Sequence, residues 1–298
     1  MTSLAPRAVL VTRQTEYQAL LAAHGTRGQV AFFLKNRDQS IEMIEDRHAD
    51  FLIALQKTRL SVPNDWSIAN GDRDDLDRFL FTANDIVIAV GQDGLVANLA
   101  KYVTHQPVIG VTPDALGSEG VLTATKITAL NQMLRAIEHG EAKTHARTMV
   151  EANLGGGETL AALNELFIGH HSHQSAKYLL TIGDAEEFQS SSGVIVTTGT
   201  GATGWARSIM TATDNFIDVQ PDDPAAVFFA REPWPSKSSG CTLKFGEIWH
   251  QETLQITSRI NEGGVIFADG VEQDYLKFDW GRRASISVSN RTLNLVVG

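Results

Sequence analysis

The hydrophobic period changes near the middle of this 298-residue chain, and this change constrains the fold more than any other feature. Up to about residue 140, short β-branched runs alternate with longer helical patterns. Such alternation predicts a mainly parallel sheet with helices on its faces. Beyond that point, short apolar runs follow one another with turn signals between them, which predicts a largely antiparallel sheet. We therefore expect an α/β N-terminal domain over residues 1–125 and a β-rich C-terminal domain over residues 126–298.

The expected elements follow from these periods. In the first domain we expect strands at 8–11, 29–34, 85–90 and 107–111, and helices at 16–24, 40–57 and 95–103. A helix at 126–139, with apolar residues at i, i+3, i+4 and i+7, is expected to connect the domains. In the second domain we expect strands at 163–168, 176–182, 194–198, 226–230, 254–257, 265–267, 284–288 and 293–297, and one short helix at 204–211.

The charge balance argues against several classes of partner. With 25 Lys and Arg against 35 Asp and Glu, the net charge is −10, and an acidic surface repels phosphate backbones. Nucleic-acid binding is therefore not expected. The apolar run at 8–11 is too short for a signal peptide or a membrane span, so no membrane partner is expected. Cys241 is the single cysteine, which fits a reducing compartment, and we expect the cytoplasm.

The first loop with the residues for chemistry is Gly91-Gln92-Asp93-Gly94, between an apolar strand and a helix. Backbone N–H groups and the positive end of a helix can hold a phosphate there, and the glycines allow close approach. A carboxylate would repel that phosphate unless it binds a metal or takes a proton from an attacking hydroxyl, as phosphoryl transfer to an alcohol requires. The alternative is a turn in which Asp93 only caps the helix.

The second loop is Gly199-Thr200-Gly201-Ala202-Thr203-Gly204. Its letters match the dinucleotide fingerprint G-x-G-x-x-G, which would favour a Rossmann dehydrogenase. That fingerprint belongs on the first strand of a βαβ unit, whereas this loop comes late, among antiparallel-type strands. We expect a glycine loop that contacts a nucleotide through the hydroxyls of Thr198, Thr200 and Thr203. A tight connection between strand and helix is the alternative.

The third loop contains Asn164 and Glu165 in an otherwise apolar strand. An amide and a carboxylate at such a position need partners, and the hydroxyls of a ribose are suitable. An edge strand with Glu165 facing water is the alternative. His170 and His173 could share one face as metal ligands, but no fourth ligand with zinc-type spacing follows, which favours a histidine-rich loop.

Taken together, the three loops resemble the NAD kinase family, whose pattern is GGDG(T), then ALNE, then a glycine and threonine loop. Three further stretches resemble the mitochondrial-type branch of that family: Ser118-Glu119-Gly120, Ser191-Ser192-Gly193 and Arg231-Glu232-Pro233. Asp269-Gly270 fits the family pattern as well. The resemblance covers the chain from about residue 85 to the C-terminus.

The resemblance implies a two-domain enzyme with its active site between the domains. ATP would donate its γ-phosphoryl group to the 2′-hydroxyl of the adenosine ribose of NAD, with a divalent cation, Mg or Mn, to give NADP. Asp93 would orient or deprotonate the attacking hydroxyl, with Gly91 and Gly94 along the phosphate path. The dinucleotide would be held by Asn164, Glu165, Thr198, Gly199, Thr200, Thr203 and Trp205. A homo-oligomer, a dimer or tetramer, is also implied.

Two residues depart from the family pattern. Gln92 replaces a glycine and Leu95 replaces a threonine, so the loop beside the presumed catalytic acid is bulkier and has lost a hydroxyl. The departures leave open polyphosphate as the donor. They also leave open a kinase of the same fold that acts on a sugar or lipid hydroxyl, and a catalytically silent regulator that binds NAD.

Overall fold

The computed structural model describes residues 5–113 and 120–298. The chain divides into two compact units. Unit 1 contains Met1–His145 and Asn294–Gly298, and unit 2 contains Ala146–Leu293. The division falls after helix α5 (Ile127–Glu138), later than the boundary expected at residue 125. The reason is that Leu130 and Leu134 of α5 are buried in the core of unit 1.

Unit 1 is built on a parallel sheet with the strand order β2-β1-β3-β4. Its strands are β1 (Arg7–Thr12), β2 (Ser67–Asp72), β3 (Asp85–Val90) and β4 (Val108–Val111). The end of β16 (Arg283–Val297) joins them, because Leu295 pairs in parallel with Val108. β3 and β4 are buried along their whole length, as expected for the middle of a parallel sheet.

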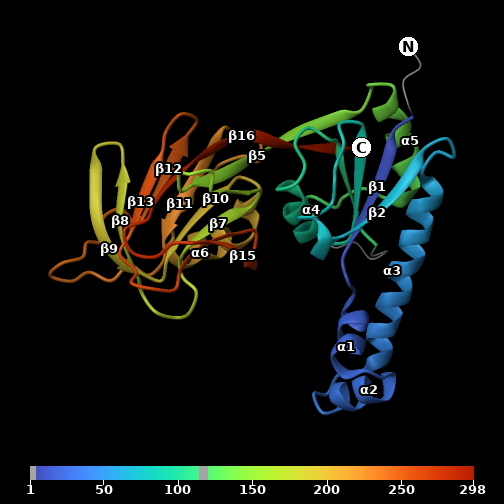
Figure 1. Cartoon of the computed structure of the whole chain (residues 1–298), viewed down its shortest axis with the longest axis horizontal. Coiled ribbons are helices and arrows are strands. Elements are labelled where there is room, and N and C mark those ends of the chain that lie inside the picture. The colour runs from blue at the N-terminus through green and yellow to red at the C-terminus, as the bar shows by residue number, and fades with distance from the viewer. Residues whose placement is uncertain (1–4, 114–119) are drawn as a thin grey trace. The chain divides into compact units, whose positions relative to one another are not determined.

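The helices of unit 1 before α5 are α1 (Glu16–His24), α2 (Arg27–Lys35), α3 (Ile41–Ser61) and α4 (Asp93–Ala100), with a short 3-10 turn, η1 (Arg73–Asp75). Figure 1 shows α1 and α2 beside the N-terminal part of the long helix α3. A small apolar cluster that includes Val30, Leu34 and Ile44 packs α2 against α3.

In unit 1, one predicted strand is wrong and one observed strand is missing from the prediction. The strand expected at 29–34 is wrong, because these residues belong to α2. Thr26 caps this helix by accepting a hydrogen bond from the backbone N–H of Gln29, and Val30 and Leu34, four residues apart, are its buried side chains. Strand β2 was not predicted, since most of its side chains are not buried and its hydrophobic signal is weak.

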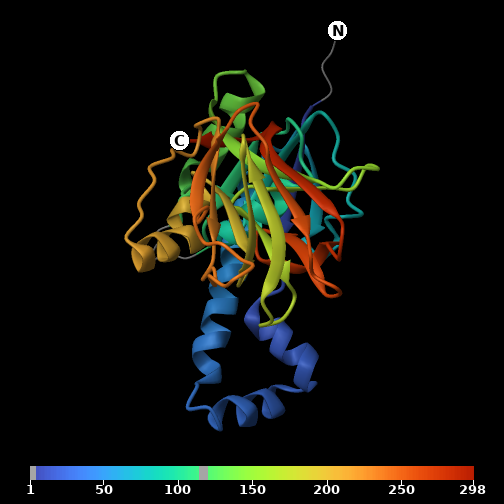
Figure 2. The same cartoon turned by 90° about the vertical axis from the view of Figure 1, so that its left-hand side faces the viewer.

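Unit 2 contains two antiparallel arrangements of strands. The first is a six-stranded sheet with the order β12 (Phe245–Trp249), β11 (Ala225–Ala230), β10 (Val194–Thr198), β7 (Glu165–His170), β14 (Gly264–Ala268) and β15 (Val271–Lys277). The second contains β16, β13 (Leu254–Ser258), β8 (Ala176–Ile182) and β9 (Ala185–Ser191), while β5 (Lys143–Asn153) pairs with β6 (Thr159–Ala162) and β16. Figure 2 shows the yellow strands β8 and β9 of this second arrangement facing the viewer.

The two faces of the six-stranded sheet have different partners, because side chains alternate along a strand. On β7, Leu166 and Ile168 enter the main core of unit 2, which also takes side chains from β8 and β13. Phe167 lies on the opposite face. There, helix α6 (Trp205–Thr213) follows a 3-10 turn, η2 (Gly201–Thr203), and packs Ala206 and Met210 against β11.

The predicted fold class is therefore confirmed, with an α/β N-terminal part on a mainly parallel sheet and an antiparallel β-rich C-terminal part. In the described part of the chain, no helix has the length and apolar character needed to cross a membrane.

Candidate functional site

Asp93 is the first residue of α4 and follows the turn after the buried strand β3. Its half-buried carboxylate accepts three hydrogen bonds from the described residues after β4. Oδ2 accepts from the backbone N–H of Val121 at 2.7 Å, and Oδ1 accepts from the backbone N–H and the hydroxyl of Thr123 at 2.9 and 2.7 Å. Among the described residues, Oδ1 has two donors and Oδ2 has one, so Oδ2 keeps more capacity for a further partner.

Gly120 is needed for this arrangement. A Cβ atom at Gly120 would lie 2.5 Å from Oδ1 of Asp93 and 2.6 Å from the hydroxyl oxygen of Thr123. A side chain there would displace the acid or its donors. Ser118 and Glu119, which belong to the same predicted stretch, lie outside the described residues.

The two residues that depart from the family pattern, Gln92 and Leu95, are not among the described donors to the Asp93 carboxylate. Gln92 is exposed, and its Oε1 accepts a hydrogen bond from Nη2 of Arg13 at 3.1 Å. Leu95 is 1% exposed and packs in the interior of unit 1, 3.1 Å from where a Cβ atom at Gly91 would lie. Gly94 is exposed, with open space on the side where a Cβ atom would stand. The extra bulk therefore lies in the interior and toward Arg13.

The turn beside Asp93 also borders a cavity of about 180 Å³ in unit 1. Gly91 and Gln92 line it together with Arg13, Arg47 and His48. Arg47 pairs with Glu16 at 3.0 Å, and both side chains are exposed. The glycine turn thus faces a basic cavity within its own unit.

In unit 2, Asp269 shapes the segment that contains Asn164 and Glu165. Its carboxylate accepts hydrogen bonds from the backbone N–H groups of Leu163 at 3.1 Å and Asn164 at 2.7 Å, and its own N–H donates to the carbonyl of Glu165. Asp269 has a φ of 53°, a left-handed conformation that aspartate tolerates better than most residues. A carboxylate from the turn after β14 therefore fixes the start of β7.

The second and third predicted loops meet at this point. The hydroxyl of Thr198 donates to the carbonyl of Leu163 at 2.5 Å, and its backbone N–H donates to the carbonyl of Asn164 at 2.9 Å. A Cβ atom at Gly201 would lie 2.3 Å from the carbonyl oxygen of Asn164, and one at Gly199 would lie 2.1 Å from that of Gln220. Both glycines are thus required by close backbone approach.

The side chains of Asn164 and Glu165 remain available to a ligand. Among the described residues, neither the Asn164 amide nor the Glu165 carboxylate makes a hydrogen bond. Burial, together with the negative charge of Asp269, raises the pKa of Glu165 to about 7. The Thr200 hydroxyl is also buried without a partner in the described chain. Groups of this kind suit a ligand that carries several hydroxyls.

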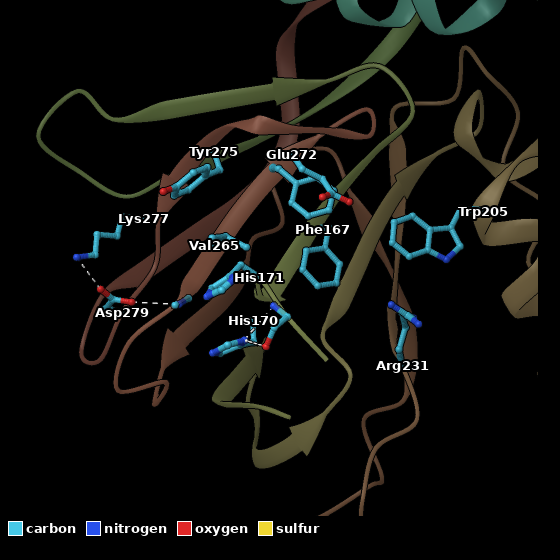
Figure 3. A pocket seen from close by; sticks show the side chains of 14 residues that line it. Phe167, His170, His171, Trp205, Arg231, Val265, Glu272, Tyr275, Lys277 and Asp279 are labelled. Carbon is cyan, nitrogen blue, oxygen red and sulfur yellow. Dashed lines mark hydrogen bonds and ion pairs between the residues drawn. The ribbon is translucent and has the colours of Figure 1, made fainter. Parts of the chain in front are cut away.

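The remaining predicted residues of unit 2 lie further along the chain. Thr203 is exposed, and its hydroxyl donates to the carbonyl of Thr200 at 3.1 Å. Trp205 begins α6 and lines a cavity with Phe167 and Arg231 (Figure 3), to which Asn164 and Glu165 do not contribute. The structure therefore brings together Asn164, Glu165, Thr198, Gly199 and Thr200, and places Trp205 in a neighbouring hollow.

The histidine cluster shows no metal site. The rings of His170 and His171 stack with centroids 4.7 Å apart, and Nδ1 of His170 accepts a hydrogen bond from the backbone N–H of Ser172. Within residues 5–113 and 120–298, no group of three His, Cys, Asp or Glu residues is placed to hold a metal ion.

The sequence of this chain is similar to those of known NAD kinases. No protein-family model matches the chain. An NAD kinase of Chlorobaculum tepidum is 30% identical over 130 residues, which are 42% of this chain and 44% of that protein. An NAD kinase of Caldanaerobacter subterraneus subsp. tengcongensis is 28% identical over 229 residues, which are 73% of this chain and 75% of that protein. The chain thus spans less than half the length of the first of these relatives and three quarters of the second.

Two solved structures share the fold. An NAD kinase from Archaeoglobus fulgidus in complex with ATP aligns with a TM-score of 0.59 at 18% identity, over 98% of this chain and 93% of that one. Yeast NADH kinase in complex with NADH aligns with a TM-score of 0.60 at 14% identity, over 99% and 84%. The sequence relatives support a relationship of this chain to the NAD kinase family, and the solved structures show that it shares their fold.

The resemblance to NAD kinases did not identify every residue that shapes the two loops. It pointed to Asp93 but not to Thr123 or Val121, which hold its carboxylate. A hydroxyl residue after a parallel strand is too common a pattern to single out Thr123. The resemblance includes Asp269-Gly270, but only the structure reveals the hydrogen bond that the Asp269 carboxylate accepts from the backbone N–H of Asn164.

Proposed function

We propose that this chain is an ATP-dependent NAD kinase that phosphorylates the 2′-hydroxyl of the adenosine ribose of NAD and produces NADP. The observation that carries the proposal is the carboxylate of Asp93, which Val121 and Thr123 hold at the start of α4, with fewer donors on Oδ2 than on Oδ1 among the described residues. The names of the relatives and the shared fold support it.

Asp93 acts as the general base in this proposal. Oδ2 takes the proton of the 2′-hydroxyl while the hydroxyl oxygen forms a bond to the γ-phosphorus of ATP. The bond between the γ-phosphorus and the bridging oxygen breaks, and ADP leaves. Thr123 and Val121 fix the rotamer of the acid, so the attacking oxygen and the base need little reorganisation.

Unit 2 supplies the binding of the dinucleotide. Asn164 and Glu165 offer hydrogen-bonding groups that have no protein partner in the described chain, and Thr200 offers a buried hydroxyl. Ribose hydroxyls both donate and accept, so they can satisfy an amide, a carboxyl group and a hydroxyl together. Thr198 and Gly199 hold the backbone of this surface in place.

A divalent cation, Mg or Mn, would bind mainly to the phosphates of ATP, since Mg²⁺ is commonly held by one or two carboxylates plus substrate phosphates. It would supply charge neutralisation at those phosphates.

Arg231-Glu232-Pro233 supports the mitochondrial-type branch, and the single cysteine supports a reducing compartment such as the cytoplasm. A homo-oligomer is proposed from the family resemblance.

The direct test is incubation of the purified protein with NAD, ATP and Mg²⁺ or Mn²⁺, with detection of NADP by an NADP-specific dehydrogenase. The proposal predicts NADP formation, and its complete absence with both ATP and polyphosphate would refute it. A catalytically silent regulator, which the departures Gln92 and Leu95 favour, would bind NAD in a calorimetric titration but would form no NADP. The comparisons do not favour a sugar or lipid kinase.

A further inference from the structure

The long helix α3 has an inner face that packs on unit 1 and an outer face that no element of unit 1 covers. The inner face contributes side chains to two apolar clusters of the unit: Ile41, Ile44, Phe51 and Leu55. In Figure 1 the sheet of unit 1 lies on one side of α3, and no helix or strand of that unit lies on the other side. The outer face is therefore a surface that the fold of unit 1 leaves without a partner.

The outer face of α3 carries a row of side chains at the spacing by which helices pair. Ala49, Ile53, Gln56 and Leu60 follow one another at steps of four, three and four residues, so they lie in line along one side of the helix. All four are exposed, Ile53 at 50% and Leu60 at 76%. Leu52, which borders the row, is 47% exposed. A continuous row of exposed apolar side chains is typical of a surface that binds another protein.

Two charged residues border this row on its other side, and neither forms an ion pair with a described residue. Asp50 and Lys57 are separated by about 10 Å along the helix axis, which is too far for them to pair with each other. By contrast, Glu45 of the same helix pairs with Arg27 at 2.7 Å. A partner that presents the opposite charges at the same spacing would satisfy both Asp50 and Lys57.

We propose that two copies of this chain pair through the outer faces of their α3 helices, which run antiparallel about a two-fold axis. In such a pair, flanking positions of the same kind meet, so Asp50 of each copy lies opposite Lys57 of the other. The small side chain of Ala49 then faces the large side chain of Leu60 of the other copy. One symmetric contact thus covers the apolar row and forms two ion pairs.

The charges and the side-chain sizes also set the direction of the two helices. In a parallel pair, Glu45 of one helix would approach Asp50 of the other, and the two carboxylates would repel each other. Ala49 would also face Ala49, which leaves that layer poorly filled. The antiparallel arrangement avoids both problems.

The strength of the contact follows from its length. The row from Ala49 to Leu60 spans about three turns of helix, which is at the small end of stable interfaces, so we expect dissociation in the micromolar range. The residues assigned to the proposed reaction are not on this face. Association is therefore measured separately from the proposed phosphoryl transfer, and either can fail without the other.

Sedimentation of the full chain, from micromolar to submillimolar concentration, tests whether this face joins two copies. Leu60→Asp places a charge in the apolar row and should weaken association about tenfold or more. Leu80→Asp is the matched control, because Leu80 is 79% exposed and lies outside α3, and it should associate like the wild type. If Leu60→Asp has the wild-type mass at every concentration, the outer face of α3 does not join the copies.

Charge reversal tests the antiparallel register. Asp50→Lys brings a lysine opposite Lys57, and Lys57→Asp brings a carboxylate opposite Asp50, so each variant alone should associate about tenfold more weakly than the wild type. An equal mixture of the two variants should associate again, because every position then meets the opposite charge. Circular dichroism confirms that each variant is folded. A mixture that associates no better than either variant alone would overturn the antiparallel pairing.

Discussion

The carboxylate of Asp269 accepts a hydrogen bond of 2.7 Å from the backbone N–H of Asn164, which lies 105 residues earlier in the chain. This contact joins the turn after β14 to the start of β7. The same carboxylate also accepts from the backbone N–H of Leu163. The Asp269 side chain therefore fixes the backbone that carries the amide of Asn164 and the carboxylate of Glu165.

Replacing Asp269 by Ala should weaken the binding of NAD and lower the free energy of unfolding by about 1–3 kcal/mol, because backbone donors lose a charged acceptor. Asp269→Asn keeps one oxygen and tolerates the left-handed backbone, so it should lose less. Urea unfolding and calorimetry measure both effects. Equal losses in the two variants would show that the acceptor oxygens are not the cause.

Gly201→Ala tests the close approach of the two loops in unit 2. The new Cβ atom would lie 2.3 Å from the carbonyl oxygen of Asn164, so the loops must separate, at a cost of about 1–3 kcal/mol. NAD affinity should fall as well. Gly28→Ala, in open space on α2, is the control and should retain both stability and affinity. A Gly201→Ala protein that matches this control would disprove the loop contact.

Thr123→Val tests how Asp93 is positioned. The hydroxyl that donates to Oδ1 is lost while the shape of the side chain is kept, so one of the contacts that orient the carboxylate disappears. The kcat for NADP formation should therefore fall about tenfold, with little change in KM for NAD. Thr123→Ser keeps the hydroxyl and should restore kcat. A folded Thr123→Val protein with the wild-type kcat would show that this hydrogen bond does not position the acid.

Glu165 should make the stability of the protein depend on pH. Its pKa is about 7 in the folded chain against an ordinary 4.5, so the folded state binds more protons than the unfolded state between these values. The contribution of Glu165 is fully present below about pH 4.5 and is lost as the pH rises through 7, with a total on the order of 3 kcal/mol.

Urea unfolding at pH 5 and pH 8 measures this effect in the wild type and in Glu165→Gln. The variant should show a smaller difference in unfolding free energy between the two pH values, because glutamine does not titrate. The same difference in both proteins would mean that Glu165 is solvated in the folded state.

The sequence was sufficient for the features that local patterns encode. The buried run of β3, the periodic apolar face of α5 and the glycine turn around Asp93 were each predicted where the structure has them. It failed at 29–34, where Val30 and Leu34 satisfy a helical period as well as a strand-like apolar run.

The contacts between distant segments could not be predicted from local patterns. No pattern near Asp93 indicates that Thr123 will donate to it, because that pairing depends on how β3 and β4 align in the sheet. The ring of Phe167 lies against two glycines, Gly169 and Gly193, that are adjacent in space and separated in sequence. Tertiary structure alone brings such residues together.

The most direct test of the central claim is the rate of NADP formation from NAD and ATP in the wild type and in Asp93→Asn, with Glu42→Gln in the first turn of α3 as the control. The account predicts a fall in kcat of at least about a hundredfold for Asp93→Asn, with NAD affinity nearly unchanged, and full activity for the control. If folded Asp93→Asn forms NADP at the wild-type rate, Asp93 is not the base.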